Sequence, residues 1–365
     1  MRIVQFVNNL DMGGLERLAV ELGRCQLAEG HQPLIYCLTH PGKLAAEASG
    51  AGIEVRAFEK PAGPQLGTLR RIVDQLRRDK PDVMHTHNHL VHHYGVAAGR
   101  LAGVPVIVNT RHGGFQVGTK SPDKKADLIF RATLPWVGAV VLISEATRRF
   151  FIQHRGVLAA KTRVILNGAP LERFVNAPAN PGSVLPRVRF GTAARLVPEK
   201  DHFTLLGAFA AVVKEVPEAE LQIAGDGPLR NRLTSFAQEL NLCNRVTFLG
   251  ALPDTVQFFS QLDIFAMSSV SEGLPLVVLE AMAAGLPVVS TRAGGVEEAA
   301  IENQNAYFAD PGDVDSLAQA MIRMAREPEL ARMGRLGRQM VEERFRIERT
   351  WQEYHGLFLS LAPRR

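Results

Sequence analysis

The stretch LDIFAMSSVSEGLPLVVLEAMAAGLPVVS (residues 262–290) predicts a complete strand–loop–helix–strand unit. Its first apolar run, Ile264–Met267, is typical of a buried strand, and Pro287–Ser290 begins the next strand. Between the two strands, Ser271 is expected to be the N-cap of a helix that has Pro275 in its first turn. This order predicts parallel strands connected by a crossover helix.

Two glutamates stand at the ends of the apolar core of this unit. Glu272 is expected just ahead of the helix N-terminus, and Glu280 about two turns inside the helix, which Gly285 ends. No charged residue separates the two carboxylates. Because ligands of open parallel sheets bind at the carboxyl ends of the strands, this loop is a candidate binding site.

The same unit recurs along the whole chain. The first half contains the candidate strands Arg2–Val7, Pro33–Thr39, Ile53–Phe58, Asp82–Thr86, Pro105–Thr110, Ala139–Ser144 and Arg163–Leu166. After NAPANPGSVLP (residues 176–186), the alternation restarts with Val188–Ala193, Glu220–Ala224, Arg245–Leu249, Ile264–Met267, Pro287–Ser290 and Ala306–Ala309. Amphipathic helical stretches such as Glu16–Glu29 and Leu66–Arg78 lie between most of these strands. The alternation predicts an α/β protein with two Rossmann-like halves of similar size.

The composition is that of an ordinary globular chain. Its 365 residues are 46% hydrophobic and 22% charged, which is enough for two domains. Cys25, Cys37 and Cys243 are scattered without a CxxC pair, which fits a reducing cytoplasm better than disulfides or a thiolate zinc site. The N-terminal segment lacks the flanks of a signal peptide, and no apolar run is long enough to span a bilayer. We therefore expect a cytoplasmic protein.

The charge is divided unevenly between the two halves. Residues 1–175 hold 23 Lys and Arg against 14 Asp and Glu, a net charge of +9, whereas residues 176–365 hold 19 against 23, a net charge of −4. One interpretation is two solvated faces. The other is attraction of the first half to an anionic membrane surface or an anionic acceptor. Nucleic acid is not expected as a partner, since aromatic residues do not interleave with the basic ones.

Three glycine turns each follow a strand and precede a helix. They contain Gly13 and Gly14 in DMGG, Gly225 in GDGP, and a pair of glycines in RAGGVEE (residues 292–298). Such turns either let backbone amides approach an anion at a helix N-terminus or are only tight turns. None of them is a G-x-G-x-x-G, which argues against a NAD-dependent dehydrogenase.

Two cations stand in one short loop. Arg195 directly follows a strand, and Lys200 comes five residues later in ARLVPEKD. In one interpretation, Arg195 caps a carbonyl group and Lys200 is solvated. In the other, they form a diphosphate clamp, because the guanidinium supplies a planar fork of donors and the ammonium a compact charge.

Histidines are concentrated in HTHNHLVHH (residues 85–93), most of which follows a strand. No cysteine or acidic residue completes a coordination set there, so a structural role or contact with an acceptor is expected rather than a metal site. His112 stands after the strand Pro105–Thr110 and before two glycines, a position that by itself favours a structural role.

The segment EGLPLVVLE resembles the E-x7-E motif of retaining glycosyltransferases with the GT-B fold, family 4 in the sequence classification. Further segments resemble the same family, in order along nearly the whole chain: MGGLER, RHGG, LNGAPLERF, ARLVPEKD, AGDGPLR, VTFLGAL, AGGVEE and FADPGDVDSLAQAM. E-x7-E by itself is a weak pattern, whereas the full series at these intervals is specific. NNLDMGGLERLAVEL and RHGGFQ are similar to the sugar transferases of exosortase-linked exopolysaccharide clusters.

The resemblance implies a GT-B fold, in which two Rossmann-like domains are separated by a deep interdomain cleft. The N-terminal, acceptor-side domain would comprise residues 1–172, and the nucleotide-sugar-binding domain residues 173–344. The C-terminal segment, residues 345–365, contains an amphipathic stretch that would form a helix crossing back to the first domain.

The resemblance also implies roles for single residues. Glu280 would bind the ribose of the donor and Glu272 the hydroxyls of its sugar. Arg195 and Lys200 would hold the diphosphate, and His112 would meet the sugar near the reacting carbon. Further donor contacts are expected from Gly13, Gly14, Gly225, Gly273 and Leu274.

The implied function is a cytoplasmic, retaining hexosyltransferase that moves a sugar from a nucleotide-sugar, with UDP favoured, to a glycan or lipid-linked acceptor. Its place would be cell-surface polysaccharide synthesis. Because no Asp-x-Asp stands at a suitable strand end, we expect no metal requirement, and no cofactor besides the nucleotide-sugar substrate. A GT-B nucleotide-sugar epimerase and a noncatalytic nucleotide-sugar-binding subunit stay open as alternatives.

Overall fold

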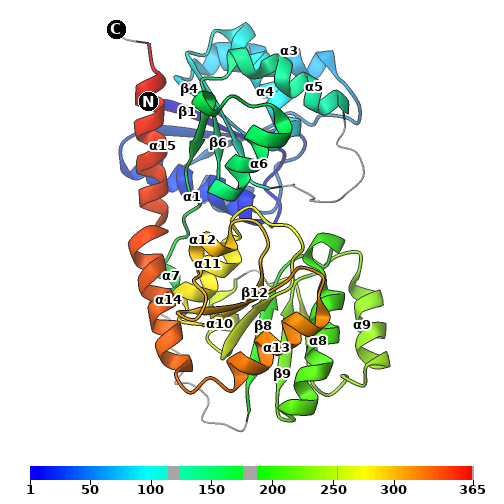
Figure 1. Ribbon diagram of the computed structural model, residues 1–365. Coiled ribbons are helices and arrows are strands. Elements are labelled where there is room, and N and C mark those ends of the chain that lie inside the picture. Colours follow the sequence, from blue (N-terminus) through cyan, green and yellow to red (C-terminus); the bar gives the residue numbers. More distant parts are fainter. Residues whose placement is uncertain (114–123, 176–186, 253, 364–365) are drawn as a thin grey trace. The chain divides into compact units, whose positions relative to one another are not determined.

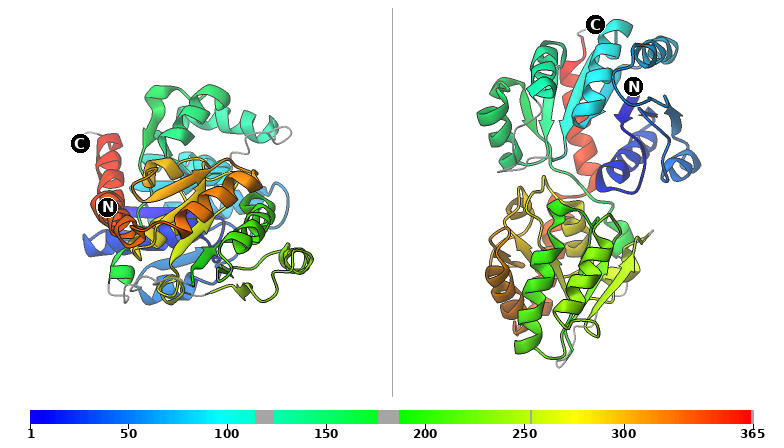
Figure 2. Two further views of the ribbon diagram at one scale, coloured as in Figure 1. Left: turned by 60° about the horizontal axis from the view of Figure 1, so that its bottom comes forward. Right: turned by 90° about the vertical axis from the view of Figure 1, so that its right-hand side faces the viewer.

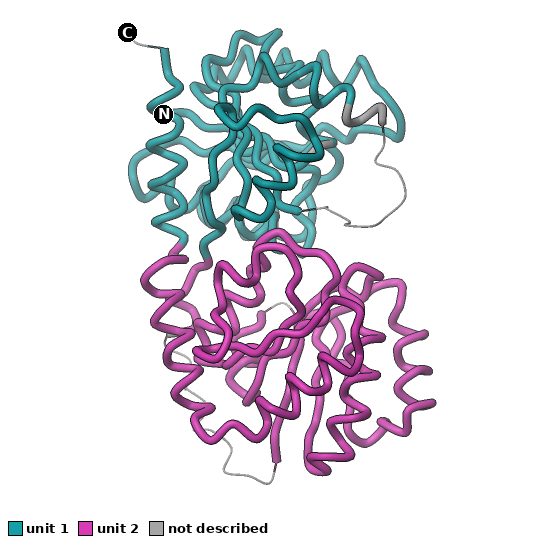
Figure 3. Tube along the Cα trace, in the orientation of Figure 1, with its two compact units in different colours: residues 1–113, 117–168, 347–365 teal, residues 114–116, 169–346 magenta. Residues whose placement is uncertain are grey.

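The computed structural model describes residues 1–113, 124–175, 187–252 and 254–363. The chain divides into two compact units (Figure 3). Unit 1 contains Met1–Gly113, Val117–Gly168 and Ile347–Arg365, and unit 2 contains Ala169–Arg346. The division falls after Gly168 and before Ile347, a few residues from the boundaries at 172 and 345 that the resemblance implied.

Unit 1 is built on a seven-stranded parallel sheet with the strand order β3-β2-β1-β4-β5-β6-β7 (Figure 1). Its strands are β1 Arg2–Val7, β2 Gln32–Cys37, β3 Glu54–Ala57, β4 Val83–His87, β5 Val106–Arg111, β6 Ala139–Leu142 and β7 Thr162–Val164. Its α-helices are α1 Gly14–Ala28, α2 Ala45–Gly50, α3 Leu66–Asp79, α4 Asn88–Ala102, α5 Lys124–Thr133, α6 Glu145–Arg155 and α15 Ile347–Leu361. Because crossovers between parallel strands are right-handed, α1 and α2 lie on one face of the sheet and α3 and α4 on the other.

Unit 2 has a six-stranded parallel sheet with the order β10-β9-β8-β11-β12-β13 (Figure 1, Figure 2). Its strands are β8 Arg189–Ala193, β9 Glu220–Ala224, β10 Val246–Gly250, β11 Ile264–Met267, β12 Val288–Thr291 and β13 Ala306–Ala309. Its α-helices are α7 Glu172–Val175, α8 His202–Glu215, α9 Arg230–Glu239, α10 Val256–Phe259, α11 Leu276–Ala283, α12 Val296–Ala299, α13 Val314–Ala325 and α14 Leu330–Arg344. The direction of the strand order reverses between β8 and β11, where open parallel sheets bind their ligands.

The predicted fold class, α/β with two parallel-sheet halves, is confirmed. Every predicted strand is present, and the ends of the strands lie within two residues of the prediction. The prediction succeeds because strands covered on both faces are nearly continuous apolar runs. In β1, for example, the side chains of Ile3, Val4, Phe6 and Val7 are all fully buried.

The helix that carries Glu280 begins later than predicted. α11 starts at Leu276 with Pro275 as its N-cap residue, so the predicted N-cap at Ser271 is wrong. The residues that would form its first turn are engaged with other loops: Glu272 pairs with Lys200, and the Gly273 carbonyl accepts from the Gly295 N–H. Glu280 consequently lies little more than one turn inside α11, instead of about two turns.

The C-terminal helix α15 completes the core of unit 1. It packs against α1 and buries Trp351, Tyr354 and Phe358 on one face. The hydroxyl groups of Tyr354 and Thr110, in β5, are hydrogen-bonded at 2.9 Å, and Thr350 Oγ1 donates to the Leu166 carbonyl at 2.9 Å. The last described helix is therefore joined to unit 1 by both apolar and polar contacts.

We expect the apolar face of α15 to contribute strongly to stability. Replacing the buried Phe358 by alanine leaves a cavity and should lower the free energy of unfolding by about 3–5 kcal/mol. Leu359→Ala, at a neighbouring side chain that is 57% exposed, should change it by no more than about 0.5 kcal/mol. Urea denaturation of both variants measures the difference, and equal losses would contradict the assignment of the buried face.

Candidate active site

The loops that follow β8 and β11 meet at the edge of unit 2 where the strand order reverses. The two strands are hydrogen-bonded neighbours. In their loops, the backbone N–H of Val270 donates to the Glu199 carbonyl at 3.0 Å, and Ser268 Oγ donates to the Lys200 carbonyl at 2.9 Å. These two bonds join the loops at the position expected for a ligand site.

Lys200 and Glu272 form an ion pair across these loops. Lys200 Nζ donates to Glu272 Oε1 at 2.5 Å, and the two side chains are 19% and 10% exposed. Because both groups are largely shielded from water, their attraction is screened less than that of a surface pair. The structure thus brings together one predicted cation and one predicted carboxylate, from positions 72 residues apart.

Arg195 belongs to the same loop but does not share this ion pair. Its guanidinium Nη2 lies 3.8 Å from the Glu199 carboxylate, and its side chain is 68% exposed. The two predicted cations therefore differ in their surroundings: Lys200 is bound to Glu272, whereas Arg195 extends toward solvent.

Gly225 and Gly227 let the loop after β9 approach the loop after β8. Gly225 has φ +138°, and an added Cβ would lie 1.8 Å from the Ala194 carbonyl oxygen. An added Cβ at Gly227 would lie 2.5 Å from the Leu196 carbonyl oxygen, and the Leu196 N–H donates to the Asp226 carbonyl at 3.0 Å. The predicted glycine turn is thus used for a close backbone approach beside Arg195.

A second glycine turn supports the loop that carries Glu272. Gly294, with φ +64°, faces the Glu272 carbonyl oxygen, which would lie 1.8 Å from an added Cβ. The next residue, Gly295, donates its N–H to the Gly273 carbonyl at 2.7 Å. Leu274 is 2% exposed, so its side chain belongs to the core and only its backbone can serve a ligand.

Glu280 has a hydrogen-bond partner that the sequence did not reveal. Thr255 Oγ1 donates to Glu280 Oε2 at 3.2 Å, and Glu280 is half-buried. Thr255 precedes the short helix α10, in a segment without a recognisable motif, so no sequence signal pointed to it.

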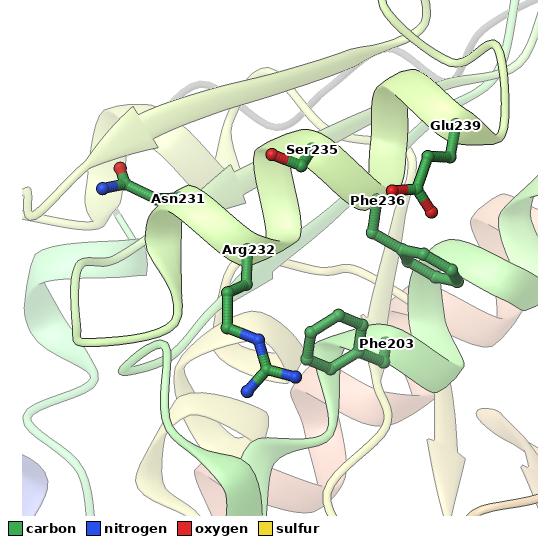
Figure 4. A pocket seen from close by; sticks show the side chains of 6 residues that line it. All are labelled: Phe203, Asn231, Arg232, Ser235, Phe236 and Glu239. Carbon is green, nitrogen blue, oxygen red and sulfur yellow. The ribbon is translucent and has the colours of Figure 1, made fainter.

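A surface pocket of about 420 Å³ lies elsewhere in unit 2, between α8 and α9 (Figure 4). It is lined by Phe203, Asn231, Arg232, Ser235, Phe236 and Glu239. The Arg232 guanidinium lies 5.5 Å from the centre of the Phe203 ring, and the rings of Phe203 and Phe236 meet edge to face at 5.3 Å. None of the predicted site residues lines this pocket, and we interpret it as a groove of helix packing.

In unit 1, His112 stands at the end of a chain of three polar side chains. His112 Nε2 lies 2.8 Å from His87 Nδ1, and His87 Nε2 lies 2.7 Å from Gln5 Oε1. The three residues come from β1, β4 and the end of β5, which are neighbouring strands. The His112 N–H also donates to Asn88 Oδ1 at 3.1 Å. Gln5 was not predicted, although a glutamine inside the apolar run RIVQFV was a signal for it, and His87 lies in the segment 85–93, for which a structural role or contact with an acceptor was expected.

This chain determines the protonation of the imidazoles. Since the Gln5 carbonyl oxygen can only accept, His87 donates from Nε2 and accepts at Nδ1, so His112 donates from Nε2. The lone pair of His112 Nδ1 is then available. Burial lowers the pKa of His87 to about 3. Burial, with contributions from His87 and Arg111, also lowers the pKa of His112 well below its usual value, so both rings are neutral at pH 7.

The remaining predicted features of unit 1 are the histidine segment 85–93 and the glycine pair Gly13–Gly14. His85 Nε2 is hydrogen-bonded to Thr110 Oγ1 at 2.7 Å, and the described side chains of residues 85–93 form no metal-ligand group. Gly13 is the extended N-cap residue of α1, with φ −169°, and Gly14 is the first residue of that helix. An added Cβ at Gly13 would meet the Glu16 carboxylate.

The sequence matches two family models, one for each half. The model described as Glycosyltransferase Family 4 matches residues 12–173, and the model described as Glycosyl transferases group 1 matches residues 179–340. Together they cover every strand of both sheets except β1, and they include Lys200, Glu272 and Glu280.

Two curated relatives show the same kinship, and one solved structure shows the same fold. The chain is 27% identical, over 81% of its length and 80% of the relative, to the UDP-Gal:alpha-D-GlcNAc-diphosphoundecaprenol alpha-1,3-galactosyltransferase of Escherichia coli. It is 31% identical, over 68% of each chain, to the GDP-mannose-dependent alpha-(1-6)-phosphatidylinositol monomannoside mannosyltransferase of Mycobacterium tuberculosis. Anabaena HepE, solved in complex with UDP and glucose, superposes with a TM-score of 0.84 at 22% identity, covering 99% of this chain and 100% of HepE. The chain belongs to the family 4 glycosyltransferases with the GT-B fold.

We expect Gly294 to be required for the position of the Glu272 loop. In Gly294→Ala, the left-handed backbone is strained and the new Cβ collides with the Glu272 carbonyl. In Gly312→Ala, the backbone is strained in the same way, with φ +77°, but the new Cβ has open space around it. Gly312→Ala should cost about 1–2 kcal/mol, and Gly294→Ala about 1–3 kcal/mol more. Urea denaturation compares the two, and equal costs would show that the backbone contact is not tight.

The buried histidines predict a loss of stability in acid. Burial lowers the pKa of His87 to about 3, and burial together with Lys200 lowers the pKa of His202 to about 4. Below about pH 6.5, the unfolded chain binds protons that the folded chain does not. Each of the two histidines should therefore remove about 1.4 kcal/mol of unfolding free energy per pH unit between roughly pH 6 and pH 4. Urea denaturation at pH 7.5, 6 and 5 measures this slope, and a His202→Gln variant with an unchanged slope would refute the assignment for His202.

Proposed function

We propose that this glycosyltransferase transfers a sugar from a UDP-sugar to a glycan or lipid-linked acceptor in cell-surface polysaccharide synthesis, with retention of anomeric configuration. The observation that carries the proposal is the shielded Lys200–Glu272 pair at the edge of unit 2 where the strand order reverses. It places a cation and a carboxylate side by side, as a diphosphate with an attached sugar requires.

The resting ion pair explains how donor binding would proceed. Without a donor, Glu272 neutralises Lys200. The diphosphate offers Lys200 a more highly charged partner, which frees the Glu272 carboxylate to accept hydrogen bonds from sugar hydroxyls. Arg195 is exposed in the same loop and supplies a second cation, and the amides of Gly273 and Leu274 precede the N-terminus of α11.

The remaining donor contacts are assigned by the same reasoning. Glu280, with Thr255 beside it, accepts from the ribose hydroxyls. Gly225 allows the close backbone approach next to Arg195. Among the residues of unit 1, we assign Gly13 and Gly14 to the donor phosphates and neutral His112 to the donor sugar, because an uncharged imidazole binds a hydroxyl without repelling a developing positive charge.

The chemistry follows the charges. The bond between the anomeric carbon and the diphosphate oxygen breaks, and the electron pair leaves with the nucleoside diphosphate. The acceptor oxygen bonds to the same face of the anomeric carbon, and its proton passes to the departing phosphate oxygen. Lys200 and Arg195 stabilise the leaving group as its charge develops. We expect this stabilisation to replace that of a metal ion, so chelators should leave the rate unchanged.

Support for the nucleotide and the acceptor comes from the relatives and the charge distribution. The relative that matches over 81% of this chain carries UDP-Gal in its name, whereas the mycobacterial relative carries GDP-mannose. Both names include a lipid-linked acceptor. Residues 1–175 carry a net charge of +9, which favours peripheral contact of unit 1 with an anionic membrane at the cytoplasmic side. In the described part of the chain, no helix has the length and apolar character needed to cross a membrane.

We expect a panel of nucleoside diphosphates and their sugars to identify the donor by thermal shift, since ligands that bind only the folded state stabilise it. UDP and one UDP-sugar should give the largest shifts. Lys200→Ala and Glu280→Ala should weaken these shifts, and Lys200→Ala should lower the transfer rate about 10²–10³-fold. Lys214→Ala, an exposed lysine of α8, is the matched control.

Three outcomes would contradict the proposal. Unchanged shifts in both Lys200→Ala and Glu280→Ala would place the donor elsewhere. Conversion of the donor without an acceptor into an epimer would identify an epimerase, and binding without any turnover would identify a noncatalytic subunit. The anomeric configuration of the product, measured by NMR, tests retention.

A further inference from the structure

Three side chains with metal-ligating groups meet at one edge of unit 1. Glu29 follows α1, His31 precedes β2, and His355 comes from α15. One ligand atom from each lies within 4.8 Å of the others, and among the described side chains this is the one group of at least three such residues. None of the three belongs to the donor site proposed above.

The distances are close to those of a metal site. Glu29 Oε2 lies 4.0 Å from His31 Nε2 and 3.7 Å from His355 Nδ1. Both distances are too long for a hydrogen bond. A tetrahedral Zn²⁺ ion, with ligands at about 2.0–2.2 Å, holds its ligand atoms about 3.3–3.6 Å apart. The two histidine nitrogens therefore need to approach the Glu29 oxygen by only about half an ångström, and the two nitrogens already lie within 4.8 Å of each other.

The imidazole rings are held in place by Trp351. The Trp351 ring stacks on His355 with centroids 5.2 Å apart at an angle of 8°, and meets His31 edge to face at 5.4 Å. Trp351 is itself 1% exposed, so it is fixed by the core. Packing therefore supplies the orientation that metal ligands elsewhere receive from surrounding hydrogen bonds.

His31 Nε2 is a buried polar atom with no hydrogen-bond partner among the described residues. The other ring nitrogen, Nδ1, lies 3.1 Å from the Met1 amino group, so Nε2 is the atom that faces Glu29. A buried polar atom without a partner is unfavourable, and a metal ion bound by Nε2 would satisfy it.

Charged groups of both signs surround the three ligands. The Met1 amino group lies 3.1 Å from His31 Nδ1. Besides Glu29, the carboxylates of Glu348 and Glu21 act on this part of the α1–α15 contact, where burial and these acids raise the pKa of Cys25 to about 12.

We infer that Glu29, His31 and His355 bind a divalent transition-metal ion of the Zn²⁺ type, which joins the end of α1 and the start of β2 to α15. Two imidazole nitrogens and one carboxylate oxygen form the ligand set, and water completes the coordination. Because α15 packs against α1, the ion would stabilise the attachment of the C-terminal helix to unit 1 rather than take part in sugar transfer.

The test uses the full chain purified without histidine tags and treated with a chelator. Titration of Zn²⁺ by calorimetry should show one site per chain, and Zn²⁺ should raise the melting temperature. Co²⁺ at the same site should give the visible absorption of a metal with nitrogen and oxygen ligands. His355→Gln and Glu29→Gln should each weaken Zn²⁺ binding by about 10-fold or more, and both should abolish the rise in melting temperature.

A matched control is His40→Gln. His40 Nε2 lies 2.8 Å from Asp11 Oδ2 in an exposed pair that has a histidine and a carboxylate but belongs to no three-ligand group. This variant should bind Zn²⁺ as the unchanged protein does. Glu29 is 41% exposed, so Glu29→Gln should fold normally, which circular dichroism without metal verifies.

Two results would overturn the inference. One is that the unchanged protein does not bind Zn²⁺, and the other is that His355→Gln and Glu29→Gln both bind Zn²⁺ as tightly as the unchanged protein does. The readout is independent of the proposed function. Removing the ion should lower the melting temperature and leave the rate of sugar transfer unchanged, whereas failure of the donor assignment would appear only in the Lys200 and Glu280 variants.

Discussion

Parallel strands cannot be joined by tight turns, and this constraint determines where both units of the protein place their polar residues. Every strand must be followed by a crossover, so the loops after β8, β9, β11 and β12 all emerge at one edge of the second sheet. Where the strand order reverses, the crossovers from β8 and β11 leave in opposite directions. Lys200 and Glu272 meet because their loops begin on these two adjacent strands.

Close backbone contacts give this edge its shape before any ligand arrives. Gly225 and Gly294 each bring a loop against a carbonyl oxygen of its neighbour, at positions that a side chain would occupy. The ion pair between Lys200 and Glu272 then satisfies two charges that are mostly withdrawn from water. In the function proposed above, such an arrangement would be preorganised, since both side chains are already held in place by their contact.

Unit 1 uses histidine in two different ways, and the partners explain the difference. In the chain Gln5–His87–His112, each imidazole is hydrogen-bonded to a neutral group. Burial keeps the rings uncharged, and the hydrogen bonds determine which ring nitrogen carries the hydrogen. At the α1–α15 contact, His31 and His355 face the Glu29 carboxylate instead. Two imidazole nitrogens beside a carboxylate form the ligand set of the proposed metal site, whereas a chain of neutral groups favours hydrogen bonding to a hydroxyl.

The sequence by itself determined the strands, their parallel alternation and the amphipathic helix α15, because burial on both faces leaves a local and periodic trace in the residue order. It also singled out Lys200 and Glu272, although not their direct contact. Only the tertiary structure decided that α11 begins at Leu276, since contacts of Glu272 and Gly273 with distant loops override the local capping signal. The same holds for the partner of His112, His87, and for His355 beside His31: these residues lie far apart in the chain, and only folding brings them together.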